Sequence, residues 1–169
     1  METLRYSRMD SPAGPLLLAA SERGLVLLAF DRGEFPPRLT GNSRVAWEES
    51  ASAIRPYARE LNEYFRGQRQ GFSFPLDLRG TPFQISCWHA LLDIPYGETR
   101  TYADIARTVG RPKGFRAVGL ANNRNPIAIV VPCHRVIASD GSLCGYGGGL
   151  DVKQKLLELE GVKLSLFAA

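Results

Sequence analysis

The chain has little cysteine and histidine and no long apolar run, and each shortage excludes a class of protein. Its three cysteines, Cys87, Cys133 and Cys144, have neither the even count of a disulfide framework nor the spacing of zinc ligands. The longest purely apolar run, 25–30, is far shorter than the ~20 residues needed to span a bilayer. The first residues lack the basic and apolar segments of a secretion signal. We therefore expect a cytoplasmic protein (nucleoid-associated if bacterial) without membrane span, metal or cofactor.

The net charge and the length of the chain exclude few classes of protein. The net charge is +4 and the pI is near 9.1. An excess of this size permits nucleic-acid binding without requiring it. With 169 residues the chain can form one or two small domains, each with its own apolar core.

The pattern of elements predicts an α+β fold. We expect residues 1–79 to form an N-terminal α/β scaffold domain with a small antiparallel sheet and one helix. Turn signals and apolar runs place its strands at 4–6, 16–20, 25–30 and 72–78, with a loop at 35–44 and the helix at 52–66. If the helix begins there, Pro56 lies in its first turn.

Residues 80–169 are expected to form a mostly helical C-terminal domain. Thr81, Pro82 and Gln84 have the pattern of an N-cap, N1 residue and capping box. Two short helices at 102–109 and 114–123, joined by a glycine-containing turn, form a candidate helix-turn-helix. The last helix is predicted at 151–160, with Asp151 as its cap and Glu160 at its end.

The most informative segment is Val131-Pro132-Cys133-His134-Arg135-Val136. The apolar run 127–131 predicts a buried strand that stops at a rigid proline. A histidine next to a thiol is a common means of forming the nucleophilic thiolate. A lone cysteine is more often a small core residue, but the neighbouring proline, histidine and arginine favour chemistry at Cys133. In an extended chain Cys133 and His134 point to opposite faces, so a water would have to bridge them.

The second helix of the pair has an unusual composition for a reader of base edges. Ala117, Gly119 and Ala121 leave much of its surface small, which allows a close approach of the backbone. Arg116 is either an ordinary solvated arginine or a probe for a groove. Glu160 is unfavourable at the negative end of a helix dipole, by about 0.3–1 kcal/mol. It is either a tolerated surface residue or a group that orients a histidine.

Residues 80–162 resemble the O6-alkylguanine-DNA alkyltransferases, also called methylated-DNA–protein-cysteine methyltransferases. The matching pieces are Gly80-Thr81-Pro82-Phe83-Gln84, Pro95-Tyr96-Gly97-Glu98-Thr99, Tyr102, Arg116-Ala117-Val118-Gly119, Asn125-Pro126, Val131-Pro132-Cys133-His134-Arg135-Val136-Ile137 and Gly145-Tyr146-Gly147-Gly148-Gly149. In this order and spacing they are highly specific. The N-terminal part resembles the family's scaffold domain only loosely.

The resemblance implies single-use direct repair of double-stranded DNA, bound through its minor groove. The protein would flip O6-alkylguanine, with O4-alkylthymine as a second substrate, out of the duplex and transfer the alkyl group irreversibly to a cysteine. In this chain the family's nucleophile, general base and orienting acid match Cys133, His134 and Glu160. Asn125 matches the residue that ties the recognition helix to the cysteine segment. Tyr102 matches the tyrosine that rotates the 3′ phosphate and can protonate the base.

The resemblance also assigns the surfaces around this centre. Arg116 matches the arginine that replaces the flipped base in the stack. The DNA-binding set further includes Ala117, Gly119, Asn123 and Arg135. The substrate pocket is expected to comprise Val136, Tyr146, Gly147 and Gly148, whose backbone groups can bind the guanine. We expect a monomer in solution and leave cooperative assembly on DNA open.

The sequence departs from the family pattern at three positions. Phe115 and Leu120 are bulkier than the small residues of many relatives, and Gly147 replaces a serine found in some of them.

Three alternative functions are considered. One rival is a cysteine hydrolase that uses Cys133, His134 and Glu160 as a triad. A second is a non-catalytic damage-binding relative, although such proteins lack the cysteine. A third is a helix-turn-helix regulator, which needs base-reading side chains.

Overall fold

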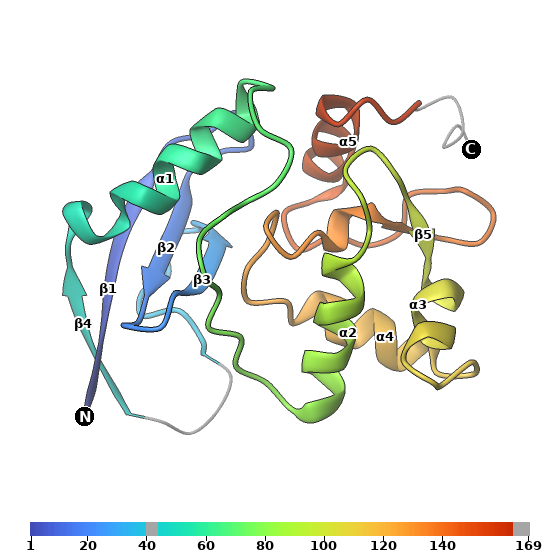
Figure 1. Cartoon of the computed structure of the whole chain (residues 1–169), viewed down its shortest axis with the longest axis horizontal. Helices are drawn as coiled ribbons and strands as arrows, with labels where there is room; N and C mark the ends of the chain where they lie inside the picture. The colour runs from blue at the N-terminus through green and yellow to red at the C-terminus, as the bar shows by residue number, and fades with distance from the viewer. Residues whose placement is uncertain (40–43, 164–169) are drawn as a thin grey trace. The chain divides into compact units, whose positions relative to one another are not determined.

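The structure is a computed structural model that describes residues 1–39 and 44–163. Its contacts divide the chain into two compact units. The first comprises 1–80 together with 126–128, and the second comprises 81–125 and 129–169. The sequence did not indicate that the three residues 126–128 pack with the first unit. The mixed sheet and helices (Figure 1) confirm the predicted α+β class.

The first unit contains a four-stranded sheet in the order β3-β2-β1-β4. Strands β1 (Glu2–Met9), β2 (Leu16–Ala20) and β3 (Leu25–Phe30) form the antiparallel meander that the turn signals predicted. Strand β4 (Val45–Glu49) pairs parallel with β1 and was not predicted. The predicted strand at 72–78 is wrong, because only an isolated bridge between Leu25 and Leu76 forms there.

Helix α1 (Ala51–Phe65) contacts β1 and β2 and lies along the sheet (Figure 1). Ser50 caps it, since its side chain accepts a hydrogen bond from the Ala53 amide. The helix therefore begins one residue earlier than expected, and Pro56 falls in its second turn rather than its first. Ile54, Leu61 and Tyr64 are buried on its inner side.

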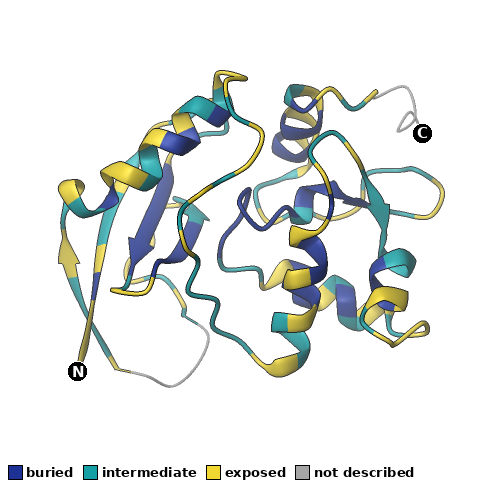
Figure 2. Ribbon diagram, in the orientation of Figure 1, coloured by how far each residue is buried: buried dark blue, intermediate teal, exposed yellow. Residues whose placement is uncertain are grey.

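The second unit is built mainly of helices. Helix α2 (Pro82–Leu92) contacts both α3 (Tyr102–Thr108) and α4 (Phe115–Asn123), which also contact each other. The buried Trp88 indole N–H donates to the Ala121 carbonyl at 2.9 Å and so joins α2 to α4. Figure 2 shows the buried inner sides of these helices. Two short strands, β5 (Arg100–Thr101) and β6 (Val136–Ile137), pair in parallel.

Capping residues set the starts of α2 and α3. Thr81 with Gln84, and Thr101 with Asp104, form complete capping boxes at α2 and α3. The start of α5 (Leu150–Leu159) differs from the prediction. Gly149, at φ 98°, is its N-cap, and Asp151 lies inside the first turn without acting as the cap.

The segment before the cysteine is buried, but it is not the predicted strand. Only Ile127 forms a bridge, with Leu28, and turns follow up to a short 3-10 helix at Cys133–Arg135. Ile129 has φ 72°, a left-handed conformation that interrupts any extended run. The apolar run correctly predicts that these residues are buried, but it does not distinguish a strand from a series of turns.

Candidate active site

Cys133 begins the 3-10 helix and receives a hydrogen bond from Asn125. The Asn125 side-chain amide donates to the Cys133 Sγ at 3.2 Å and to the Val131 carbonyl at 2.7 Å. Because Asn125 comes directly after the C-cap of α4 at Arg124, it connects that helix to the cysteine segment. Burial raises the pKa of the Cys133 thiol, while the Asn125 bond and the charge of Lys153 act in the opposite direction.

His134 is fully buried and paired with Glu160 from the end of α5. Its Nε2 lies 2.7 Å from a Glu160 carboxylate oxygen. Since an ionised carboxylate can only accept, the neutral imidazole carries its proton on Nε2. The unprotonated Nδ1 has no hydrogen-bond partner among the described residues. Burial lowers the pKa of His134, against the opposing effect of Glu160, so the ring is a neutral base at rest.

Cys133 and His134 are not in an extended chain, so the premise behind the predicted bridging water is wrong. Successive residues of a 3-10 helix still project about 120° apart. The conclusion that the two side chains do not stack therefore keeps a physical basis in the helical geometry.

Arg135 is buried against the same carboxylate. Its Nε and one terminal nitrogen donate to the two Glu160 oxygens at 2.7 and 3.1 Å, and the other nitrogen donates to the Ile94 carbonyl at 2.7 Å. Only 7% of Arg135 is exposed. This placement does not fit its predicted role in DNA contact, because all three guanidinium nitrogens are used inside the unit. The sequence alone could not show this, since Glu160 is 25 residues away.

Glu160 thus orients two side chains at once, the neutral His134 imidazole and the Arg135 guanidinium. Burial acts to raise its pKa, but the hydrogen bonds and charges of His134 and Arg135 outweigh it and lower the pKa to about 2. The carboxylate is therefore ionised under any ordinary condition. Glu160 is 4% exposed, which removes the alternative that it is a tolerated surface residue at a helix end.

Tyr102 reaches this region through the short parallel sheet. Strand β5 pairs Arg100 with Val136 and Thr101 with Ile137, and Tyr102 follows directly as the first residue of α3. Its hydroxyl donates to the Cys144 carbonyl at 2.9 Å. Burial, together with the nearby Cys144 and Cys133 sulfurs, raises the pKa of Tyr102 to about 12. The phenol therefore keeps its proton and can donate it.

Lys153 is a site residue that the sequence analysis missed. Its side chain is fully buried, and its Nζ donates to the carbonyls of Val136 (2.6 Å), Cys144 (3.0 Å) and Gly145 (3.4 Å). Burial lowers its pKa to about 8, against the opposing charges of Cys133 and Cys144. A signal was present, because Lys153 lies three and four positions before the buried Leu156 and Leu157.

Three of the predicted pocket residues, Tyr146, Gly147 and Gly148, belong to the loop 144–149 (the pocket loop), whose Cys144 and Gly145 carbonyls accept from Lys153. The Val136 carbonyl already accepts from Lys153, so one lone pair remains for another donor. Burial raises the pKa of Tyr146 well above its usual value. A β-carbon added at Gly147 would meet no atom within 4 Å. The loop therefore has room beside its backbone at Gly147.

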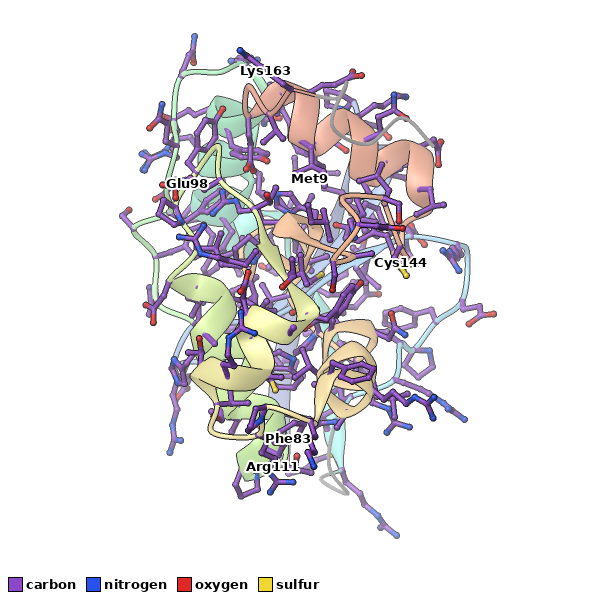
Figure 3. The ribbon with its side chains drawn as sticks, turned by 90° about the vertical axis from the view of Figure 1, so that its right-hand side faces the viewer. Met9, Phe83, Glu98, Arg111, Cys144 and Lys163 are labelled. Atoms are coloured by element: carbon purple, nitrogen blue, oxygen red, sulfur yellow. The ribbon has the colours of Figure 1, made fainter. Side chains whose placement is uncertain are left out.

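Helix α4 presents the other predicted residues. Val118, Ala121 and Asn122 are buried, Ala117 and Gly119 are partly exposed, and Arg116 and Asn123 are exposed. In the preceding turn the Arg111 guanidinium lies over the Phe83 ring of α2, 4.8 Å from its centre, and Figure 3 shows the two side chains next to each other.

Two negative findings concern the part of the chain that the structure describes. Within 1–39 and 44–163 no group of three or more histidine, cysteine or acidic residues is arranged to hold a metal ion. None of the helices formed by these residues has the length and apolar content needed to cross a membrane.

Comparison with known proteins identifies the family. Residues 82–162 match the model of the 6-O-methylguanine DNA methyltransferase DNA-binding domain, and residues 4–78 match that of its ribonuclease-like domain. A methylated-DNA–protein-cysteine methyltransferase of Methanosarcina barkeri is 52% identical over 155 residues, which cover 92% of this chain and 96% of the relative. One from Mycobacterium leprae is 53% identical over 152 residues, covering 90% and 89%.

Solved structures agree. The crystal structure of Mycobacterium tuberculosis OGT in complex with DNA has a TM-score of 0.82 and 47% identity, covering 99% of this chain and 96% of that one. The M. tuberculosis O6-methylguanine methyltransferase has a TM-score of 0.83 and 46% identity, covering 98% and 99%. With both halves matched and about half of its residues identical to these relatives, the chain belongs to the methylated-DNA–protein-cysteine methyltransferase family.

Proposed function

We propose that this protein repairs alkylated DNA by moving the alkyl group from O6 of guanine to the Cys133 sulfur. The observation that carries the proposal is the arrangement around that sulfur. Cys133 receives the Asn125 amide and is followed by a histidine whose Nε2 is held by Glu160 and whose Nδ1 can accept a proton. Membership of the family supports the same activity.

The reaction is a single displacement at the alkyl carbon. The Cys133 thiol loses its proton, through a water, to His134 Nδ1. The thiolate attacks the alkyl carbon, the new carbon–sulfur bond forms, and the bond between the carbon and O6 breaks. The electron pair of that bond goes to the guanine, which takes up a proton. The product is a stable thioether, so each molecule reacts once and the enzyme is not regenerated.

Tyr102 and the pocket loop bind the leaving guanine and stabilise the charge that develops on it. Because the pKa of Tyr102 is raised to about 12, its phenol holds a proton that it can give to the base as negative charge develops there. Backbone N–H groups at Tyr146, Gly147 and Gly148 stabilise the charge on O6, and the Val136 carbonyl accepts from the exocyclic amine. Lys153 holds this loop against Val136.

The substrate is a damaged base in double-stranded DNA. Helices α3 and α4 bind the duplex through its minor groove, and Arg116 takes the place of the flipped base in the stack. The match of 82–162 to a DNA-binding domain and the similar M. tuberculosis protein crystallised with DNA support this partner. O4-alkylthymine is the second proposed substrate. We place the protein in the cytoplasm, as a monomer.

The main alternative function is that of a cysteine hydrolase, because Cys133, His134 and Glu160 also resemble a catalytic triad. It would release product and turn over repeatedly. The exposed Arg116 on α4 and the proton-holding Tyr102 have no role in such a reaction. A non-catalytic damage-binding protein would not need the Cys133 thiol.

Intact mass spectrometry tests the proposal. The protein is incubated with excess duplex that carries one O6-methylguanine, next to duplex with unmodified guanine and next to the Cys133→Ala variant. We expect the wild type to gain the mass of one CH2 group, at Cys133, only with the damaged duplex. No gain combined with retained binding to the lesion would show a damage-binding protein. A wild-type protein that neither gains mass nor binds the lesion would favour the cysteine hydrolase hypothesis.

A further inference from the structure

Leu120 occupies the outer side of α4 and is unusually exposed for a leucine. Successive helix residues project about 100° apart. The buried Val118, Ala121 and Asn122 define the inner side, which leaves Arg116, Leu120 and Asn123 along the opposite side. Leu120 is 62% exposed, more than Phe115 at 51%, which lies toward the edge of this face. A leucine at the centre of the outer face contributes nothing to the core of the unit.

The surroundings of Leu120 are positively charged. From Ile105 to Ser139 the chain contains no aspartate or glutamate. Two of the six arginines and lysines in this stretch are used in ion pairs, Arg107 with Asp104 and Arg135 with Glu160. The others have no carboxylate partner among the described residues: Arg111, Lys113, Arg116 and Arg124. An apolar side chain in a field of this sign suits a polyanion that also has apolar parts.

These charges distinguish between occupants. A second copy of the chain, docked about a two-fold axis through this face, would bring the same cations against themselves. The DNA minor groove offers phosphates for the cations and apolar deoxyribose walls for the leucine. Proteins that bind this groove insert leucine and similar apolar side chains to open it. Gly119 next to Leu120 lets the backbone come close, since a β-carbon there would have open space.

We propose that Leu120 packs against the sugars of the minor groove one helical turn from Arg116 and makes the protein prefer damage in a duplex over the same damage in a single strand. This inference rests on the proposed function. It goes beyond it because the preference is assigned to an apolar side chain and not to the charged residues. A single strand has no groove wall and cannot make the contact.

The test compares one oligonucleotide containing O6-methylguanine as a duplex and as a single strand. The second-order rate of methyl transfer and the equilibrium affinity are measured for the wild type, Leu120→Ala, Leu120→Gln and Leu120→Met. Leu92→Ala is the matched control, because Leu92 is an exposed leucine at the end of α2. We expect Leu120→Ala and Leu120→Gln to lose about tenfold with the duplex. Their single-strand values and melting temperatures should stay at the wild-type level, and Leu120→Met should retain the duplex rate.

The salt dependence of the duplex affinity distinguishes the loss of an apolar contact from the loss of a charged one. Removing an apolar contact should leave the slope of log affinity against log salt unchanged, whereas a lost phosphate contact makes it shallower. Equal rates for Leu120→Ala and wild type on the duplex would overturn the inference, and so would equal losses on both substrates. If the wild type itself transfers no methyl group, the proposed function fails, and the affinities for duplex and single strand still decide the role of Leu120.

Discussion

The two side chains that we propose to take part in the reaction, Cys133 and His134, are both neutral at rest. Burial raises the pKa of Cys133 and lowers that of His134, so the resting state is a thiol and a neutral imidazole, not an ion pair. A neutral thiol suits a protein that can react only once, because it is a poor target for adventitious electrophiles. In the proposed reaction the thiol proton passes to the unprotonated Nδ1 of His134.

The pH dependence of simple alkylation tests this resting state. The rate at which iodoacetamide modifies Cys133 should rise with pH and should not level off near about 8.5, the value of a free cysteine. Asn125→Ala should shift the curve further to high pH, because the bond that favours the thiolate is lost. Peptide mapping separates Cys133 from the exposed Cys144, which serves as the internal control. A plateau reached near pH about 6 would instead show a preformed thiolate.

Gly147→Ser tests the free space in the pocket loop. The position has no positive φ and no atom within 4 Å of an added β-carbon, so the variant should fold with an unchanged melting temperature. The new hydroxyl can donate to O6, and we expect an equal or faster single-turnover methyl transfer. Gly149→Ser is the contrast. There φ is 98° and the β-carbon would lie 2.7 Å from an Asp151 oxygen, so this variant should lose stability. A slower Gly147→Ser protein would show that the loop needs the space.

At the scale of elements, helix ends were predictable where the capping partner is close in sequence. Thr81 with Gln84 and Thr101 with Asp104 lie three residues apart, and both boxes are present. Asp151 followed the same pattern and yet is not a cap, because Gly149 already provides the turn into α5. Strand β4 was not predicted because it depends on pairing with β1, more than 40 residues earlier in the chain.

Gly119→Ala separates what α4 needs for folding from what it needs for binding. No positive φ and no neighbour within 4 Å requires a glycine at this interior helix position. Alanine should therefore stabilise the fold by about 0.5–1 kcal/mol, measured by urea denaturation. The duplex affinity should nevertheless fall, because an extra methyl group keeps the backbone away from the groove. Unchanged duplex affinity would show that α4 does not approach DNA closely at this point.

At the scale of the whole molecule, the cluster of His134, Arg135 and Glu160 links stability to pH. The pKa of Glu160 is about 2 in the folded protein, against an ordinary value of 4.5. A lowered carboxyl pKa stabilises the fold above about 4.5, and this contribution is lost as the pH falls from about 4.5 toward about 2. The unfolding free energy, measured by urea titration, should therefore decrease through this window.

The Glu160→Gln variant tests whether Glu160 causes this loss of unfolding free energy at acid pH (the acid limb). The variant should lose about 3–5 kcal/mol at neutral pH, because the Arg135 guanidinium stays buried without its countercharge. It should also show a flatter pH dependence below pH about 4.5. Glu158→Gln, at an exposed position of α5, is the matched control and should behave as the wild type. An unchanged acid limb in Glu160→Gln would assign the pH dependence to other carboxylates.

The sequence by itself determined the features that depend on near neighbours or on ordered motifs: the α+β class, the capped helix starts and the family. Only the tertiary structure decided which distant groups meet. It buried Arg135 against Glu160 and Lys153 among three carbonyls, and it turned the predicted strand before Cys133 into turns and a 3-10 helix. The physical reason is that burial and countercharge come from residues remote along the chain, so neither spacing nor local propensity could reveal them.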